Sequence, residues 1–287
     1  MKEHQARGIV LSALLEEQLA ESGQLVRTSS IAEGLAALHR PMLCALSPTN
    51  SPLLPPVRMI GEVKYHSQKI ECAQLYDFAG ILHDVEALSR GNAAARYQNV
   101  GCVFSATSFS TTAQKFAWAN GIALFSFESS RFLRSSLLFL QDFIRENAGA
   151  IRDISREELI KAYHEARTHT YLNQNFNRPA VALASLGGIY PVLLCGEGDF
   201  LSELEKTPAI SAAQVQQYGD RFEMRFDFRA GSHALECLIP TEMLDKVLAH
   251  PLTRSGEPLA LMLPLPGGNG RSVRIDLPLM QWEQSTI

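Results

Sequence analysis

The chain has 287 residues and a mass of 31.7 kDa, which corresponds to about two domains at ~150 residues each. Apolar residues make up 46% and charged residues 20%, a balance that excludes a disordered chain and is typical of a globular protein. The formal net charge of −4 excludes a basic coat that would bind nucleic acid over the whole surface. Acidic residue types are unevenly placed, because no Asp precedes Asp77.

Cysteine usage and hydropathy predict a cytoplasmic protein without a membrane partner. The five cysteines are scattered and form no CxxC pair, so reduced thiols are expected. No apolar run approaches the ~20 residues of a membrane span, and the N-terminus lacks an apolar signal core. Residues 181–287 hold 8 basic and 13 acidic side chains, which favours a protein partner over a phosphate backbone for this acidic segment.

The first half of the chain alternates predicted helices with predicted strands. Apolar periodicity and turn residues predict, in chain order, a helix over 4–22, strands near 41–46 and 57–65, a helix over 70–88, a strand over 100–105, a helix over 111–120 and a strand over 122–127. Such alternation predicts an α/β class with a mixed sheet flanked by helices.

The second half changes from helical to strand patterns. Residues 129–172 are predicted to be helical, with a capping box formed by Ser155 and Glu158, and residues 173–179 are predicted to be a linker. Period-2 alternation over 222–228 and 273–279 predicts strands, and residues 267–270 are expected to turn a hairpin that pairs the latter with a strand over 259–265. A helix is expected near 242–249. We therefore predict a domain over 1–130, a helical connector over 131–178 and a smaller β-rich domain over 179–287.

The stretch that indicates chemistry is Gly61-Glu62-Val63-Lys64-Tyr65-His66. On a strand, Glu62 and Lys64 project from the same face, because side chains alternate with period 2. A carboxylate beside an ammonium suits metal-assisted phosphodiester cleavage, with Glu62 binding Mg²⁺ and Lys64 orienting water or stabilising charge on phosphorus. The alternative is a simple pair of opposite charges on an exposed strand.

Several further segments extend this pattern in a fixed order. A helix opens at Arg7-Gly8, Glu62-Val63-Lys64-Tyr65 follows on a strand, and Gln74 lies on the next helix. The run from Phe104 to Ala117 then gives a strand, a Ser/Thr-rich loop and a helix before Asn120-Gly121-Ile122. In this order the region of about residues 5–130 resembles the Mrr-like restriction endonucleases of the PD-(D/E)xK nuclease superfamily.

The resemblance implies a restriction-endonuclease-like fold that hydrolyses DNA with Mg²⁺, in defence against foreign DNA. It also implies a catalytic set of Glu62, Lys64 and Gln74.

Two positions depart from the family pattern. Ser12 stands where the family has an acidic residue on the first helix, and Pro41-Met42-Leu43-Cys44 stands where it has a catalytic Asp. Three alternatives follow. Glu16 or Glu17 reaches the site from the first helix, Glu71 or Asp77 joins Glu62 as a metal ligand from the following helix, or no carboxylate fills the position. In the last case the fold serves as a catalytically silent DNA-binding or scaffold subunit of a larger complex.

The Ser/Thr-rich loop and nearby basic residues are candidates for contacting DNA. Ser105, Thr107 and Ser108 precede a helix N-terminus, where hydroxyl and N–H groups can hold a phosphate. Lys115 extends this candidate path toward Arg131 and Arg134. The alternatives are ordinary helix capping by the hydroxyls and a solvated helix face for the basic residues.

Overall fold

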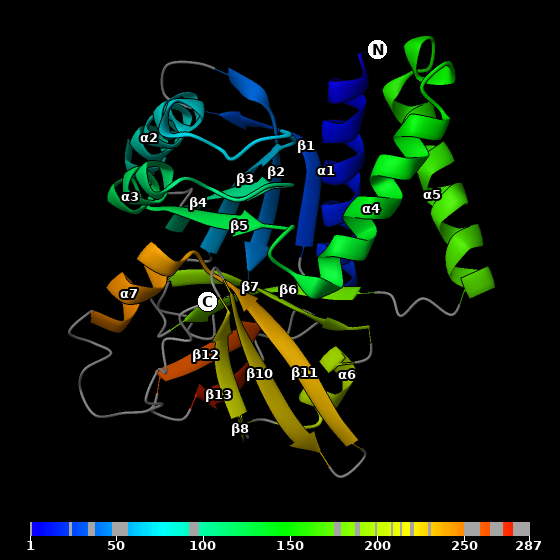
Figure 1. Cartoon of the computed structure of the whole chain (residues 1–287). Helices are drawn as coiled ribbons and strands as arrows, with labels where there is room; N and C mark the ends of the chain where they lie inside the picture. Colours follow the sequence, from blue (N-terminus) through cyan, green and yellow to red (C-terminus); the bar gives the residue numbers. More distant parts are fainter. Residues whose placement is uncertain are drawn as a thin grey trace.

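A computed structural model gives the arrangement of most of the chain. The described residues are 2–22, 25–33, 38–47, 57–91, 98–174, 179–186, 190–198, 200–207, 209–212, 214–218, 221–228, 231–249, 259–264 and 272–277. Two sheets stand one beyond the other, with most helices around the first (Figure 1). The predicted α/β class is confirmed at this level.

The first sheet has five strands in the order β1-β2-β3-β4-β5. Its strands are β1 (Leu25–Glu33), β2 (Leu38–Ser47), β3 (Val57–Lys64), β4 (Gln98–Ser105) and β5 (Ile122–Ser126). Strands β1, β2 and β3 pair antiparallel, whereas β3, β4 and β5 pair parallel. The Glu-x-Lys strand β3 is therefore the middle strand, with an antiparallel neighbour on one side and a parallel neighbour on the other.

Helices cover both faces of this sheet (Figure 1). One face carries the short helix η1 (Cys72–Leu75) with α2 (Tyr76–Gly91) and α3 (Thr111–Ala119), and the other carries α1 (Glu3–Glu21). Helices α4 (Arg131–Glu146) and α5 (Arg156–Gln174), joined through η2 (Ala150–Arg152), pack against α1. Helices α4 and α5 thus fall within the predicted helical connector of 131–178 and pack beside the first sheet through α1.

The second sheet has eight strands in the order β8-β13-β12-β6-β7-β11-β10-β9. Its elements are β6 (Pro179–Leu186), β7 (Tyr190–Glu197), α6 (Phe200–Glu205), β8 (Ala209–Ser211), β9 (Gln214–Tyr218), β10 (Arg221–Phe228), β11 (Gly231–Leu238), α7 (Thr241–Ala249), β12 (Leu259–Pro264) and β13 (Ser272–Leu277). All neighbours pair antiparallel except β8 and β13. The predicted pairing of residues 259–265 with 273–279 is confirmed by β12 and β13, while its turn at 267–270 lies outside the described residues.

The apolar cores of the two sheets are continuous. One cluster of buried side chains runs from α1 and the first sheet through α4 into β6, β7 and β11. Gln18 of α1 also donates to the backbone carbonyl of Pro179, at the start of β6. The two sheets are therefore joined by packing as well as by the chain.

Within the first sheet, strand β1 has no counterpart among the sequence predictions. The segment of β1 contains Arg27-Thr28-Ser29-Ser30, whose polar side chains mask a strand pattern. It is stabilised by pairing with β2, and register shifts between Arg27 and Ser30 and between Ile31 and Glu33 interrupt the ladder.

Other local predictions agree closely with the structure. The Ser155–Glu158 capping box forms, with Ser155 N donating to Glu158 Oε2 over 2.9 Å and Glu158 N donating to Ser155 Oγ over 3.2 Å.

None of the described helices combines the length and apolar character needed to cross a membrane.

Candidate functional site

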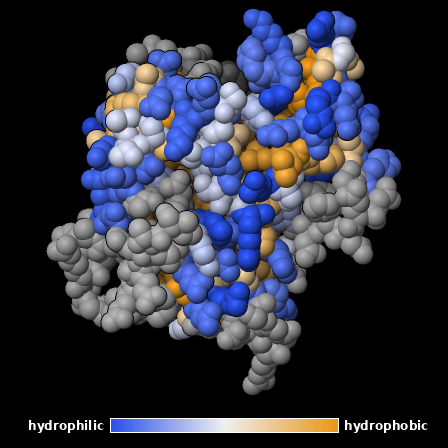
Figure 2. Space-filling model, in the orientation of Figure 1, coloured by the Kyte–Doolittle hydropathy of each residue, from blue (hydrophilic) through white to orange (hydrophobic). Residues whose placement is uncertain are grey.

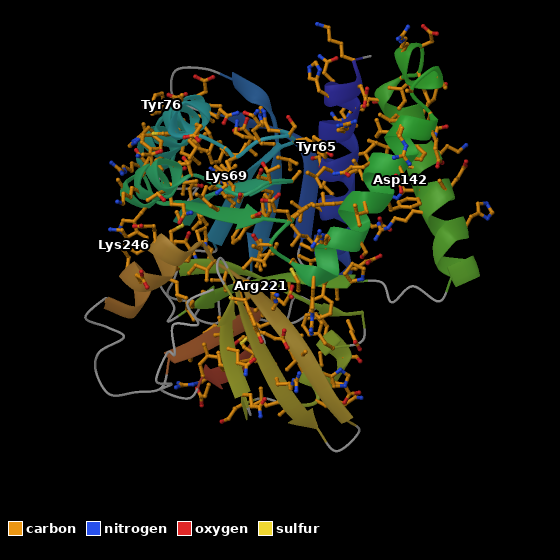
Figure 3. All side chains as sticks on the ribbon, viewed as in Figure 1. Tyr65, Lys69, Tyr76, Asp142, Arg221 and Lys246 are labelled. Atoms are coloured by element: carbon orange, nitrogen blue, oxygen red, sulfur yellow. The ribbon has the colours of Figure 1, made fainter. Side chains whose placement is uncertain are left out.

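Strand β3 ends with Glu62 and Lys64 on the face of the sheet that α2 covers. The register pairs Ile60 with Gly101, and a Cβ built on Gly101 would meet the Leu82 side chain of α2. Because Ile60, Glu62 and Lys64 alternate on β3, all three project toward this face. Tyr65 has the opposite parity and packs beneath the Arg7 guanidinium of α1 (Figure 3).

The two side chains form an ion pair. Lys64 Nζ lies 2.9 Å from Glu62 Oε2, and the side chains are only 14% and 10% exposed. At this burial the attraction between the charges is little screened by water. Lys64 therefore holds the carboxylate that the sequence assigns to a metal.

His66 and Gln74 extend the pair toward η1. Gln74 Nε2 lies 3.3 Å from His66 Nδ1, while Gln74 Oε1 accepts from the Glu71 N–H over 2.7 Å. Partial burial lowers the pKa of His66, the charge of Lys64 lowers it further, and the charge of Glu62 opposes both. The predicted catalytic residues Glu62, Lys64 and Gln74 are thus linked through His66, which contacts Gln74 and is affected by the charges of the other two. The only sequence signal for His66 is its position two residues after Lys64.

Backbone contacts fix the segment that follows β3. Ile70 N donates to the carbonyl of Ser108 over 2.9 Å, and Ser110 N donates to the carbonyl of Ile70 over 3.0 Å. A further bond runs from Ala106 N to the carbonyl of Lys64. The loops after β3 and β4 are therefore tied together beside the ion pair.

The residues expected to complete a metal centre do not gather around Glu62. Glu71 is exposed as the N-cap of η1, and Asp77 is exposed in the first turn of α2. Within the described ranges, no group of three or more His, Cys, Asp or Glu side chains is arranged to hold a metal ion. On β2, the register sets Leu43 opposite Gly61, so the adjacent strand supplies no carboxylate here.

Glu16 and Glu17 of α1 are engaged elsewhere. Glu17 pairs with Arg167 of α5, and its Oε2 lies 3.4 Å from His164 Nδ1. Ser12 donates to Glu16 Oε1 over 3.3 Å. Burial raises the pKa of Glu16, and the Ser12 hydroxyl and the Arg156 charge offset that effect in part. A hard divalent cation prefers several charged oxygens, and this set of donors around Glu62 does not fit one.

Two of the hydroxyl groups proposed to contact DNA, those of Ser105 and Thr107, make hydrogen bonds within the protein. The buried Ser105 Oγ accepts from Thr107 N over 3.1 Å, and Thr107 Oγ1 donates to the carbonyl of Gln68 over 2.9 Å. Ser108 N donates to a Glu128 carboxylate oxygen over 2.8 Å. The N-cap of α3 is Ser110, whose Oγ accepts from Ala113 N. Only the Ser110 contact caps α3, whereas those of Ser105, Thr107 and Ser108 lie within the loop before it, and Lys115 is exposed on α3.

A second polar cluster lies where α4 meets the second sheet. The carboxylate of Glu236 on β11 is fully buried and accepts from Ser130 Oγ over 2.7 Å and from Arg131 N over 3.1 Å. Arg221 Nη1 on β10 lies 2.6 Å from Glu236 Oε1. No sequence spacing indicates this cluster, because the partners of Glu236 lie 15 to 106 residues from it in the chain.

Comparison with known proteins adds little to this geometry. No family model matches the chain, and no curated protein matches it. The chain is similar to one crystal structure, described as that of the protein of unknown function AF1548, at 18% identity and a TM-score of 0.34. The match covers 55% of this chain and 96% of the other.

Proposed function

We propose that this chain is a nuclease-fold DNA-binding protein whose Glu-x-Lys pair has become a structural ion pair, so that the chain alone does not cleave DNA. The order of elements supports a restriction-endonuclease-like unit. A first helix, the antiparallel strands β1 and β2, the Glu-x-Lys strand, a helix next to Gln74 and two parallel strands separated by α3 follow one another in the chain. Apart from the additional strand β1, the Mrr-like resemblance implies the same order.

The observation that carries the proposal is the contact between Lys64 Nζ and Glu62 Oε2 at 2.9 Å in a mostly buried setting. Binding of a divalent cation at Glu62 would have to displace this ammonium, and the neighbouring donor set would leave most of the cation's charge uncompensated. The pair is neutral as a unit, which favours a structural role at the end of β3.

Two exposed lysines, one on the segment after β3 and one on α3, are suited to phosphate contacts. Lys69 (Figure 3) precedes Ile70, which is bridged to Phe109 before α3, and Lys115 is exposed on that helix. The Glu62 carboxylate is paired with Lys64 and not with either of these lysines. Lysines contact phosphates as flexible point charges that give affinity without sequence selection.

A cleavage and binding assay tests the proposal. We expect purified protein to leave supercoiled plasmid intact with Mg²⁺ or Mn²⁺, and to bind DNA with unchanged affinity after Glu62→Gln. Substitution of both Lys69 and Lys115 by Ala should weaken binding and make it less dependent on salt, since two phosphate contacts are lost. Absence of DNA binding by the unaltered protein at low salt would refute the proposal.

Metal-dependent DNA hydrolysis is the second candidate, favoured by the convergence of Glu62, Lys64, His66 and Gln74. It predicts plasmid cleavage that Lys64→Ala abolishes and Arg90→Ala, on the far end of α2, leaves unchanged. It also predicts that calorimetric titration with Mg²⁺ detects a site that Glu62→Gln removes. These two results together would replace the silent-subunit proposal.

A further inference from the structure

Four arginines gather where the outer face of the second sheet meets the first turn of α4. They are Arg131 and Arg134 of α4 with Arg221 and Arg225 of β10, and together with Tyr218 of β9 we call them the arginine surface. Figure 2 shows a strongly hydrophilic area at this junction, and Figure 3 places Arg221 in it.

Strand alternation explains why these side chains share one face. On β10, Arg221 and Arg225 alternate with Met224, which is fully buried against the core of the sheet. The register sets Arg221 opposite Tyr218 and Arg225 opposite Gln214. On α4, Arg134 follows Arg131 by three residues and so lies on the same side of the helix.

Two carboxylates hold the arginines without neutralising them all. Glu236 is fully buried beneath Arg221 and the N-terminus of α4, and Glu223 Oε2 lies 3.3 Å from Arg131 Nη1. The side chains of Arg131 and Arg225 remain 46% and 57% exposed. Arg131, Arg221 and Arg225 share the carboxylates of Glu223 and Glu236. Three guanidinium charges thus face two carboxylate charges, and Arg134 adds a fourth, exposed guanidinium.

Aromatic rings lie beside the guanidinium groups. The Arg221 guanidinium lies 4.9 Å from the centre of the Tyr218 ring, and the Arg131 guanidinium lies 4.7 Å from the centre of the Phe132 ring. Tyr218 is 41% exposed, one of the most exposed large apolar side chains described. An exposed ring backed by an arginine can stack on a base, while neighbouring arginines bind the phosphates on either side.

We propose that the arginine surface binds single-stranded DNA, with phosphates on Arg134 and Arg225 and a base stacked on Tyr218. The inference rests on the proposed function in that it names the strand form bound and a second part of the chain, besides Lys69 and Lys115, that binds it. Single strands are favoured over duplex because only an unpaired base presents its face to Tyr218. An acidic peptide would satisfy the charges but would leave the Tyr218 ring without a stacking partner.

Fluorescence anisotropy with the full chain tests this inference. The probes are a labelled single-stranded oligonucleotide about 16 nucleotides long and the corresponding duplex, each titrated between ~50 and ~200 mM salt. The test variants are Arg134→Ala/Arg225→Ala and Tyr218→Leu. The matched control is Arg90→Ala/Arg145→Ala, which removes the same charge from exposed ion pairs on α2 and α4.

We expect Arg134→Ala/Arg225→Ala to weaken binding of the single strand about tenfold and to reduce the salt slope by about 1.4, the value for two phosphate contacts. Tyr218→Leu should weaken the single strand about fivefold or more and the duplex much less, as stacking requires. The control double variant should bind within about twofold of the unaltered protein, and circular dichroism should show that all variants are folded.

Other outcomes separate this inference from the proposed function. Binding that is lost in Lys69→Ala/Lys115→Ala but kept in both arginine-surface variants would overturn the inference and leave the proposed function standing. Equal weakening by the control double variant, or equal competition by polyglutamate, would also overturn it, because bulk charge would then account for binding. Absence of any DNA binding would overturn both.

Discussion

His66 shows how a single residue reports on the charges around it. Its ring lies 3.3 Å from the Gln74 amide nitrogen, and its pKa is lowered by burial and by the charge of Lys64, while the charge of Glu62 raises it. Because the pKa in the folded state is below the value of ~6.5 for an unfolded chain, the unfolded state binds the proton first. This contribution to stability is therefore complete above pH ~6.5 and is lost as the pH falls toward the folded-state pKa.

The His66 pKa should respond in opposite directions to the two members of the pair. Lys64→Met removes a positive charge and should raise it, whereas Glu62→Gln removes a negative charge and should lower it. Titration of the imidazole resonances by nuclear magnetic resonance measures both shifts, with His83 of α2 as an internal control. Shifts of the same sign in the two variants would contradict the ion-pair geometry.

Residue-level prediction from sequence was limited by chemistry that depends on neighbours distant in the chain. Period 2 placed Glu62 and Lys64 on one face, and the family resemblance brought Gln74 to them. The pattern does not indicate which partner the Glu62 carboxylate binds, so it could not show that Glu62 forms an ion pair with Lys64. Nor could it find Glu236, whose partners Ser130 and Arg221 come from two other elements.

At the scale of elements, the packing of α2 onto the first sheet depends on the absence of a side chain at one position. A Cβ built on Gly101 of β4 would lie 2.1 Å from Leu82 Cδ1, so the two elements approach closely there. Both residues belong to the buried layer that sets the height of α2 above Glu62 and Lys64.

Gly101→Ala should therefore lower the free energy of unfolding by about 1–3 kcal/mol through overpacking. Leu82→Ala alone should cost about 2–5 kcal/mol by leaving a cavity. The double variant should lose less than the sum, because the new methyl group enters the space that Leu82 vacates. Urea denaturation of the three variants measures this, and strict additivity would exclude the close approach.

Elements were predictable where local signals are strong and were missed where pairing decides. The Ser155–Glu158 box and the alternation over β10 and β13 depend on residues close in sequence, and they appear as expected. Strand β1, with its central Thr and Ser residues, forms because β2 offers a partner. Such tertiary stabilisation is absent from any local pattern.

At the scale of the whole molecule, Glu236 links the two sheets through the N-terminus of α4. The buried carboxylate is compensated by Arg221 from its own sheet and by Ser130 and Arg131 from the helical layer of the other. Removing the charge would leave Arg221 with a weakened partner and the helix N-terminus without its anion.

Glu236→Gln should lower the free energy of unfolding by about 3 kcal/mol and the midpoint of thermal unfolding by ~5 °C or more. Differential scanning calorimetry should also show the single transition of the unaltered chain broadening or dividing, since the joint between the sheets is weakened. The control is Glu86→Gln, which removes an exposed pair with Arg90. Equal effects of the two substitutions would show that Glu236 has no special role in joining the sheets.

The strand order of the second sheet has a consequence for the timing of folding during synthesis. Strands β6 and β7 form a hairpin at its centre, and β11, β10 and β9 can add to one side as soon as they emerge from the ribosome. Strand β8, although synthesised before all three, pairs in parallel with β13 and must wait for the last strand described. Chains truncated near residue 250 and released from the ribosome should already protect β7 and β11 from proteolysis while β8 remains open to it.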